Sequence, residues 1–275
     1  MSHAAAPIVT GLYVPGDRPD RFAKAVATQA QLVILDLEDA VADSDKDAAR
    51  QHVVDWLGSD DAKPPYLEVR VNAGVSDDLV ALATVAGSFA VRLPKVDSPD
   101  DVDAALAVLG LDVPISALIE TARGLTAATA IAAHPGVSSV GLGEADLASD
   151  LGSADTSVLD WARVQLLVAA RTAGKPPPMM SVFTDIGDLD GLAADTQRGR
   201  RMGFVGRTAI HPRQVPVIAA AFNPTDDEVA WSLAVVAATA AGGVTTLTSG
   251  EMVDPAMRRR AEGILALRRV ATTST

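Results

Sequence analysis

The sequence predicts a parallel α/β fold, a closed (β/α)8 TIM barrel followed by a C-terminal helical extension. Short apolar runs rich in β-branched residues recur at fairly even intervals, and segments with a helical period separate them. This strict alternation implies parallel strands joined by crossover helices. Eight such strands favour a closed barrel, and an open doubly wound sheet is the alternative.

Eight segments are predicted as strands because they are short and apolar. In chain order they are Ile8–Val14, Leu32–Leu37, Tyr66–Val71, Phe89–Leu93, Pro114–Ile119, Val137–Leu142, Met179–Phe183 and Phe204–Thr208. Between them, apolar residues at three- and four-residue spacing predict amphipathic helices. These are Asp20–Gln29, Lys46–Leu57, Asp77–Ala86, Pro99–Leu109, Gly124–Ala133, Val158–Thr172 and Leu189–Met202.

The chain continues well beyond the eighth strand, so we divide it into a barrel domain, residues 1–222, and an extension, residues 223–275. The tail is too long to be the eighth barrel helix alone, and we expect it to pack on the barrel or on a neighbouring subunit. Its predicted parts are a helix at Arg213–Phe222, an alanine-rich helix at Asp226–Ala241 ended by Gly242–Gly243, a polar stretch at Thr245–Gly250 and a last helix at Pro255–Arg269.

Composition excludes several classes of protein. Of the 275 residues, 48% are hydrophobic and 21% are charged, which is typical of a folded chain with a sizeable core. The formal net charge of −12 repels phosphate, so we do not expect nucleic-acid binding. The chain has no cysteine and four histidines, which excludes thiolate chemistry and indicates that any metal is a hard ion with oxygen ligands.

Membrane and secretion signals are missing from the sequence. No stretch reaches the roughly 20 apolar residues that a spanning helix needs. Met1–Thr10 lacks a basic region followed by an apolar core, so a secretory signal is not expected and the cytoplasm is the expected location. The P-loop, G-x-S-x-G and H-E-x-x-H motifs do not occur either, and Gly141 and Gly143 lack the third glycine of a phosphate loop.

Charged side chains follow several predicted strands at their C-terminal ends, where TIM barrels carry their active sites. Several carboxylates around one mouth repel each other, and an acid directly after a buried strand needs a partner. A divalent cation together with Arg70 and Lys95 would offset that repulsion. The charged residues at these strand ends are Asp36, Glu38, Asp39, Arg70, Lys95, Glu120, Glu144, Asp146, Asp185 and His211.

Glu120 and Asp146, from successive strands, form a predicted magnesium site. Mg²⁺ prefers oxygen ligands and usually keeps water or substrate oxygens at its other positions. The alternative is that each acid caps the helix that follows it. For Asp146 or Asp185 alone the cap is the better interpretation, whereas the whole set at one end of a barrel favours a metal site.

Two further patterns remain open. Arg18, Arg21 and Lys24 follow the first strand at three-residue spacing and form either a solvated helix face or a phosphate-binding edge. His211, before a proline, is either a catalytic base or, as is more usual for a lone histidine there, a residue that bonds the backbone.

Six motifs then point to a known family. They are Leu12-Tyr-Val-Pro-Gly-Asp-Arg-Pro-Asp-Arg-Phe22, Val33-Ile-Leu-Asp-Leu-Glu-Asp-Ala-Val41, Val69-Arg-Val-Asn72, Leu93-Pro-Lys95, Leu118-Ile-Glu-Thr-Ala-Arg-Gly124 and Thr208-Ala-Ile-His-Pro212. Each is modest alone, but the ordered set is highly specific. The chain resembles the citrate lyase β-subunit-like branch of the HpcH/HpaI aldolase family, which includes malyl-CoA and citramalyl-CoA lyases.

The resemblance implies a magnesium-dependent barrel that makes or breaks a carbon–carbon bond next to a coenzyme A thioester. It implies that Glu120 and Asp146 are the metal ligands and that Arg70 holds the substrate carboxylate. Glu38 and Asp39 match an acidic pair that orders metal-bound water and neighbouring side chains.

The resemblance also reaches the tail. Gly250–Pro255 resembles the family's lid motif, whose aspartate, here Asp254, enters the active site of an adjacent subunit. This implies at least a dimer, and the family implies a trimer or a hexamer. Arg18 and Arg21 match the segment near the CoA phosphates, and we add Lys95 to the expected substrate-binding set.

The expected reaction converts a β-hydroxyacyl-CoA, such as malyl-, citramalyl- or citryl-CoA, into acetyl-CoA or another acyl-CoA and a 2-oxo acid, or the reverse. Arg70 would stabilise developing negative charge, and Asp254 would exchange a proton with the thioester enolate. Three alternatives remain: a class II pyruvate aldolase with a histidine base, a malyl-CoA thioesterase and a non-catalytic scaffold subunit. One departure, Pro7–Thr10 where the family often has a basic residue, concerns the acyl-CoA edge.

Overall fold

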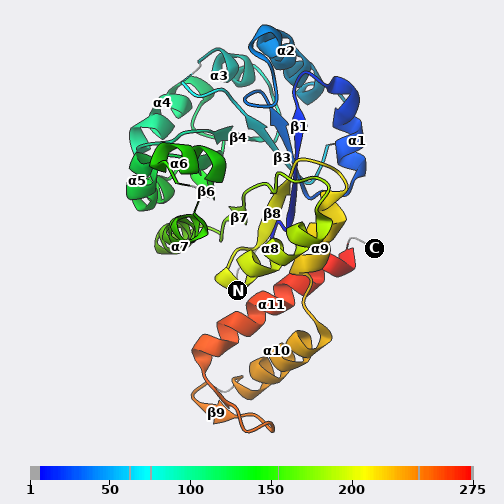
Figure 1. Ribbon diagram of the computed structural model, residues 1–275, viewed down its shortest axis with the longest axis vertical. Helices are drawn as coiled ribbons and strands as arrows, with labels where there is room; N and C mark the ends of the chain where they lie inside the picture. Colours follow the sequence, from blue (N-terminus) through cyan, green and yellow to red (C-terminus); the bar gives the residue numbers. More distant parts are fainter. Residues whose placement is uncertain (1–6, 62, 75, 154, 241, 274–275) are drawn as a thin grey trace.

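Eight parallel strands form a nearly closed barrel in the computed structural model, which describes residues 7–61, 63–74, 76–153, 155–240 and 242–273 (Figure 1). The order of hydrogen-bonded strands is β6-β5-β4-β3-β2-β1-β8-β7, so sequence neighbours are also sheet neighbours. This order confirms the predicted TIM barrel over the doubly wound sheet. The strands are β1 (Thr10–Pro15), β2 (Leu32–Asp36), β3 (Tyr66–Arg70), β4 (Ala90–Leu93), β5 (Ile115–Ile119), β6 (Val137–Leu142), β7 (Met179–Met180) and β8 (Gly206–Ala209).

The barrel has a seam between β6 and β7, which contact each other but share no ladder in the described part of the chain. The predicted seventh strand, Met179–Phe183, is correct in place but too long, because β7 contains two residues. Pro176–Pro178 directly precede it, and proline has no N–H to donate to a ladder. In the described part of the chain this edge therefore has no ladder with β6, and the Ser181 hydroxyl directly after β7 donates to the Leu142 carbonyl of β6 instead.

Helices cover the outside of the barrel (Figure 1). Each predicted helix is present within a few residues of its expected bounds, and two helices in the described ranges, α6 and the short 3-10 helix η2, were not predicted. No helix in the described ranges has the length and apolar run needed to cross a bilayer. The helices up to the end of the barrel are η1 (Pro19–Arg21), α1 (Phe22–Ala27), η2 (Asp43–Asp45), α2 (Lys46–Leu57), α3 (Ser76–Ala83), α4 (Pro99–Leu109), α5 (Ala122–Ala133), α6 (Glu144–Leu151), α7 (Thr156–Thr172), α8 (Leu189–Met202) and α9 (Gln214–Phe222).

The core lies between the strands and these helices. Every residue of β2 and β5 is buried, as expected for parallel strands covered on both faces. β8 approaches β1 so closely that a Cβ on Gly206 would lie 2.6 Å from the Val9 carbonyl oxygen. Glycine at this position thus allows the first and last strands to pair and the barrel to close on this side.

The C-terminal extension is a pair of helices that projects from the barrel (Figure 1). It comprises α10 (Asp226–Ala238), a hairpin of β9 (Thr245–Thr246) and β10 (Met252–Val253), and α11 (Pro255–Thr273). α10 and α11 pack on a small core of Val235, Val253 and Ala261, and Leu267 of α11 packs against the main core. α10 ends at Ala238, before the predicted Ala241, which lies outside the described residues.

Candidate active site at the mouth of the barrel

A cavity of about 1510 Å³ runs through the inside of the barrel. Its lining includes residues from the C-terminal ends of β2, β3 and β5 and from the first turn of α6, namely Asp36, Arg70, Glu120 and Asp146. This volume exceeds the range of about 300–1000 Å³ common for small-molecule sites. Side chains that the sequence places at separate strand ends therefore share one space.

Arg70, the last residue of β3, is fixed by the acid beside it on β2. The strand register pairs Asp36 with Arg70. The guanidinium donates to Asp36 through Nε (2.7 Å) and Nη2 (2.6 Å), which is the strong bidentate geometry. Burial alone would lower the pKa of Arg70, but the hydrogen bonds and charge of Asp36 raise it. Arg70 is thus a permanent cation held in one orientation.

The remaining nitrogen of Arg70 faces the acidic pair after β2. Nη1 lies 2.8 Å from Glu38 Oε2 and 3.1 Å from Asp39 Oδ2. Glu38 is buried, whereas the Asp39 carboxylate is exposed. Burial raises the pKa of Glu38, although the Arg70 charge opposes this. Arg70 therefore links the two predicted acids to the strand that carries Asp36.

A polar layer that the sequence analysis missed lies beneath Arg70. The Arg70 guanidinium stacks on the Tyr13 ring, 5.0 Å from its centre, and Arg92 lies on the same ring at 5.6 Å. Arg92 donates to the Tyr13 hydroxyl (3.0 Å) and pairs with Glu68 at 2.5 Å. The signal was present as charged residues inside the apolar strands at Glu68 and Arg92. These contacts support Arg70 from inside the barrel.

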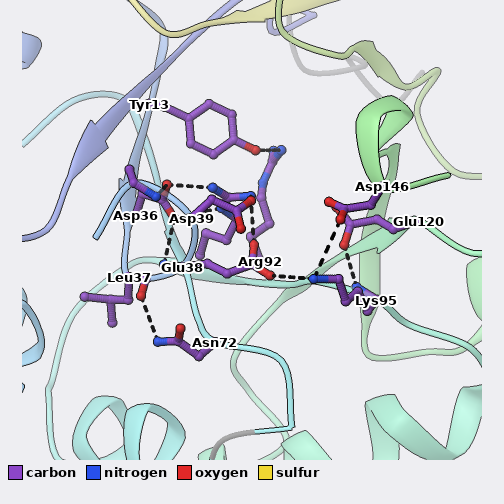
Figure 2. A network of polar contacts seen from close by, with 12 residues as sticks. Tyr13, Asp36, Leu37, Glu38, Asp39, Asn72, Arg92, Lys95, Glu120 and Asp146 are labelled. Atoms are coloured by element: carbon purple, nitrogen blue, oxygen red, sulfur yellow. Dashed lines mark hydrogen bonds and ion pairs between the residues drawn. The ribbon is translucent and has the colours of Figure 1, made fainter. Parts of the chain in front are cut away.

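Lys95 connects the carboxylates on the other side of the mouth (Figure 2). Its backbone N–H donates to Glu120 Oε2 at 2.8 Å. Its ammonium lies 3.5 Å from Glu38 Oε1 and 3.9 Å from Asp146 Oδ1. Figure 2 shows the Glu120 and Asp146 carboxylates beside each other, facing this lysine. The two predicted ligands and Glu38 thus converge on one region.

This group of acids carries more negative charge than Lys95 offsets. Burial raises the pKa of Glu120 to about 7, with the neighbouring charges of Glu38 and Asp146 adding to the rise and the Lys95 N–H opposing it. Oε2 of Glu38 accepts no hydrogen bond in the described structure, although it pairs with Arg70. An added cation would reduce the electrostatic repulsion among these carboxylates.

The donor set fits a hard divalent cation. Glu120 and Asp146 offer carboxylate oxygens, and Mg²⁺ commonly uses one or two carboxylates and takes its other ligands from water or substrate. Among the described residues, no group of three or more His, Cys, Asp or Glu side chains forms a complete metal site. A two-carboxylate site that is open to substrate agrees with both facts.

Replacing Glu120 by glutamine is expected to stabilise the metal-free protein above pH 7. Below the ordinary pKa of 4.5 the carboxyl is neutral in both folded and unfolded chains, and the two proteins should agree. As pH rises to about 7, the unfolded chain ionises first and the parent loses stability. At pH 8 we expect a gap on the order of 2 kcal/mol, or about 5 °C in Tm, by calorimetry in EDTA. Equal Tm values at pH 8 would contradict the raised pKa.

The predicted cationic edge after β1 is partly neutralised. Arg18 pairs with Asp20 at 3.0 Å, and Lys24 lies 3.7 Å from the same acid. Arg18 and Arg21 are both outside the described lining of the cavity. A role near the CoA phosphates therefore stays a prediction for these two arginines.

The interpretation of His211 as a backbone-bonded residue agrees with the structure, whereas the interpretation of Asp185 as a helix cap is wrong, because the N-cap of α8 is Asp188 and Asp185 bonds the loop before it. Asp185 Oδ1 accepts the N–H groups of Gly187 and Asp188. His211 Nδ1 accepts the N–H of Arg213 at 3.1 Å. Both side chains thus have local structural partners, and nothing in these contacts favours a histidine base.

Asp254 lies in the extension and not at the mouth of its own barrel. It precedes α11 and accepts the N–H groups of Ala256 and Met257, each at 2.9 Å, as a helix cap. The hairpin next to it occupies the end of the extension far from the barrel (Figure 1). The structure of one chain therefore does not bring Asp254 together with Arg70 and Glu120.

A parallel barrel with clustered carboxylates and a fixed arginine at its mouth defines a class, the carbon–carbon bond lyases of the TIM-barrel fold, and residues 169–270 match the sequence profile of that description. The chain belongs to the HpcH/HpaI aldolase/citrate lyase family, whose profile matches residues 9–212. Within it, the chain falls in the citrate lyase beta-like branch, related to malyl-CoA lyases.

Named relatives support this placement. A (3S)-malyl-CoA thioesterase of Cereibacter sphaeroides is 37% identical over 236 residues, covering 83% of this chain and 82% of the relative. An L-malyl-CoA/beta-methylmalyl-CoA lyase of the same species is 33% identical and covers 92% of each chain. The crystal structure of CitE from Mycobacterium tuberculosis with magnesium, acetoacetate and coenzyme A superimposes with a TM-score of 0.83 at 35% identity, covering 96% of this chain and 98% of that chain.

Proposed function

We propose that the protein is a Mg²⁺-dependent lyase that cleaves or forms a β-hydroxyacyl-CoA, with an acyl-CoA and a 2-oxo acid as the other reactants. One observation carries the proposal: the carboxylates of Glu120 and Asp146 face the region around Lys95 and line the cavity that Arg70 also lines. Such a site suits a small anionic substrate bound between a cation and an arginine.

Arg70 binds the carboxylate of the 2-oxo acid in this proposal. Its guanidinium cannot turn, because Asp36 holds two of its nitrogens and Tyr13 supports its face. Asp39, which is exposed and, in the described part of the chain, hydrogen-bonded only to Nη1 of Arg70, is the acid that can move aside for a substrate carboxylate. A fixed cation at this point stabilises the negative charge that develops in the transition state.

Glu120 and Asp146 would hold the metal ion in this scheme, with Glu38 beside them. When bound, Mg²⁺ supplies Lewis-acid polarisation of the oxo-acid oxygens and orients the substrate. Lys95 then keeps Glu120 in place through its backbone N–H and balances the charge of Glu38. In this proposal Arg70 thus binds the substrate carboxylate, whereas Glu120 and Asp146 bind the metal.

Asp254 is proposed to deliver the proton to the acyl-CoA enolate on cleavage and to remove it on condensation. Because Asp254 lies at the far end of the extension, we propose a homo-oligomer, a trimer or a hexamer, in which the extension of one subunit covers the mouth of another. An apolar lid around Asp254 would raise its pKa toward the range that a proton donor needs.

Hydrolysis of malyl-CoA is the second candidate, favoured by the 37% identity to a relative named (3S)-malyl-CoA thioesterase. The two reactions share the substrate class and differ in the bond that breaks. Incubation with Mg²⁺ and malyl-, citramalyl- or citryl-CoA separates them: a lyase releases a 2-oxo acid and retains the thioester, whereas a thioesterase releases free thiol without oxo acid. Release of neither product by any of the three would refute both functions.

An Arg70→Lys variant is expected to raise the KM for the 2-oxo acid and to lower kcat/KM by roughly 10²–10³-fold. Lysine keeps the charge but cannot form the bidentate pair with Asp36 or stack on Tyr13. The measurement is condensation of acyl-CoA with glyoxylate or pyruvate. Arg171→Lys, an exposed change on α7, is the matched control and should behave as the parent. An unchanged KM in Arg70→Lys would remove Arg70 from the substrate site.

A further inference from the structure

Gly143 lies between β6 and α6, directly beside the proposed metal ligand Glu120. A Cβ atom built on Gly143 would collide with Oε1 of Glu120 and would lie 2.5 Å from its Cγ and 2.6 Å from its Cδ. All three of the nearest atoms to such a Cβ belong to Glu120. The missing side chain of Gly143 therefore provides the space that the Glu120 carboxylate occupies.

The backbone of Gly143 does not itself require glycine. Its φ is −91° and its ψ is 87°, a conformation on the side of φ that L-residues adopt. Glycines that are needed for conformation, such as Gly152 at φ +64°, have open space where a Cβ would be. The reason for glycine at position 143 is thus the space beside Glu120.

Lys95 holds the same carboxylate from the opposite end. Its N–H donates to Oε2 of Glu120 at 2.8 Å. Lys95 has φ +52°, one of two non-glycine residues with positive φ in the described part of the chain, the other being Gln29. This sparsely populated conformation of the lysine backbone accompanies the hydrogen bond to Glu120. Glu120 is therefore fixed between a strained amide donor and a glycine.

We propose that Gly143 is a positioning residue for the metal site, which holds the Glu120 carboxylate against the Lys95 amide so that it faces the same region as Asp146. The inference rests on the proposed role of Glu120 as a metal ligand. It also explains the second glycine of Gly141-Leu-Gly143, which the sequence left without a function. A methyl group at position 143 displaces the end of the Glu120 side chain from the Lys95 amide, and because it contacts side-chain rather than backbone atoms it leaves the barrel folded.

The first test is Mg²⁺ affinity by isothermal titration calorimetry, with the metal alone as the probe. Gly143→Ala should fold and should weaken Mg²⁺ binding by 10-fold to 100-fold, the range seen when the support of a metal ligand is lost. Gly58→Ala is the control: Gly58 has φ −80°, and its Cβ would have ordinary contacts at 3.6 and 3.8 Å. Parent-like Mg²⁺ affinity in Gly143→Ala would overturn the proposal.

The second test needs no metal and separates this inference from the proposed function. In EDTA, Gly143→Ala should lower Tm by roughly 3 °C, because the buried Glu120 loses its N–H donor. In a Glu120→Ala background the same change should cost nothing, since the space is then vacant. An equal cost in both backgrounds would refute the positioning role. Coupling without Mg²⁺ binding by the parent would support the positioning role and refute the metal assignment.

Discussion

Glu120→Ala is expected to lower Mg²⁺-dependent turnover at least ~10³-fold. The change removes one of the two carboxylates proposed to hold the metal, and a bound metal contributes several kcal/mol of transition-state stabilisation, each 1.4 kcal/mol being about tenfold in rate. It also deletes the acceptor of the Lys95 N–H. Turnover should be measured with the best substrate of the CoA-thioester panel over a range of Mg²⁺ concentrations.

Calorimetric titration with Mg²⁺ distinguishes loss of the metal from other damage to the site. We expect no saturable binding in Glu120→Ala and parent-like binding in Asp190→Ala, an exposed acid in the first turn of α8. If Glu120→Ala bound Mg²⁺ as tightly as the parent does, Glu120 would not be a ligand. The interpretation of the whole mouth as a metal site would then need a different pair of acids.

Asp254→Asn is expected to lower kcat by roughly 10²–10⁴-fold while leaving Mg²⁺ affinity unchanged, because it removes a general acid and no metal ligand. Asparagine is as good a helix cap as aspartate, so the bonds to the Ala256 and Met257 amides persist and Tm should stay near that of the parent. The measurement is kcat for cleavage, with Tm as the control for folding. Wild-type cleavage by this variant would exclude Asp254 from the reaction.

Mixing two inactive variants tests whether Asp254 acts in a neighbouring subunit. Asp254→Asn chains retain an intact barrel mouth, and Glu120→Ala chains retain an intact extension. If the site combines residues of two subunits, co-expression of both should restore part of the parent activity. If Asp254 served its own barrel, no mixed assembly would contain a complete site and activity would stay at the level of the single variants.

The fold was largely predictable because its signals are local. The buried runs of β2 and β5 and the amphipathic helices between strands repeat a pattern that is typical of parallel α/β folds, and the number of strands favoured the barrel among them. Local patterns failed where the backbone lacks donors or the segment is short. β7, which follows three prolines, has two residues and forms no ladder with β6 in the described chain. α6 is eight residues long, and its acidic sequence was interpreted as a loop.

The sequence predicted which residues lie at the mouth of the barrel, but not how their side chains pair and stack there. Glu120 and Asp146 follow apolar strands, so their place at the mouth follows from the fold. The pairing of Asp36 with Arg70 depends on the register between β2 and β3, and the stacking on Tyr13 depends on closure of the barrel. The positive φ of Lys95 likewise has no signature in the sequence. These features arise from contacts between strands far apart in the chain.

The unpaired edge beside β7 has a mechanical consequence for the barrel. A barrel whose strand ladder is interrupted at one place, here between β6 and β7, resists widening less than a barrel with a fully closed ladder, because the hydrogen bonds between strands do not run around its full circumference. Glu120 after β5, Asp146 after β6 and Arg70 at the end of β3 all follow strands of one continuous arc, which runs from β6 back through β1 to β7. A widening of the gap between β6 and β7 would therefore leave the strands that carry Arg70, Glu120 and Asp146 paired and in register with one another.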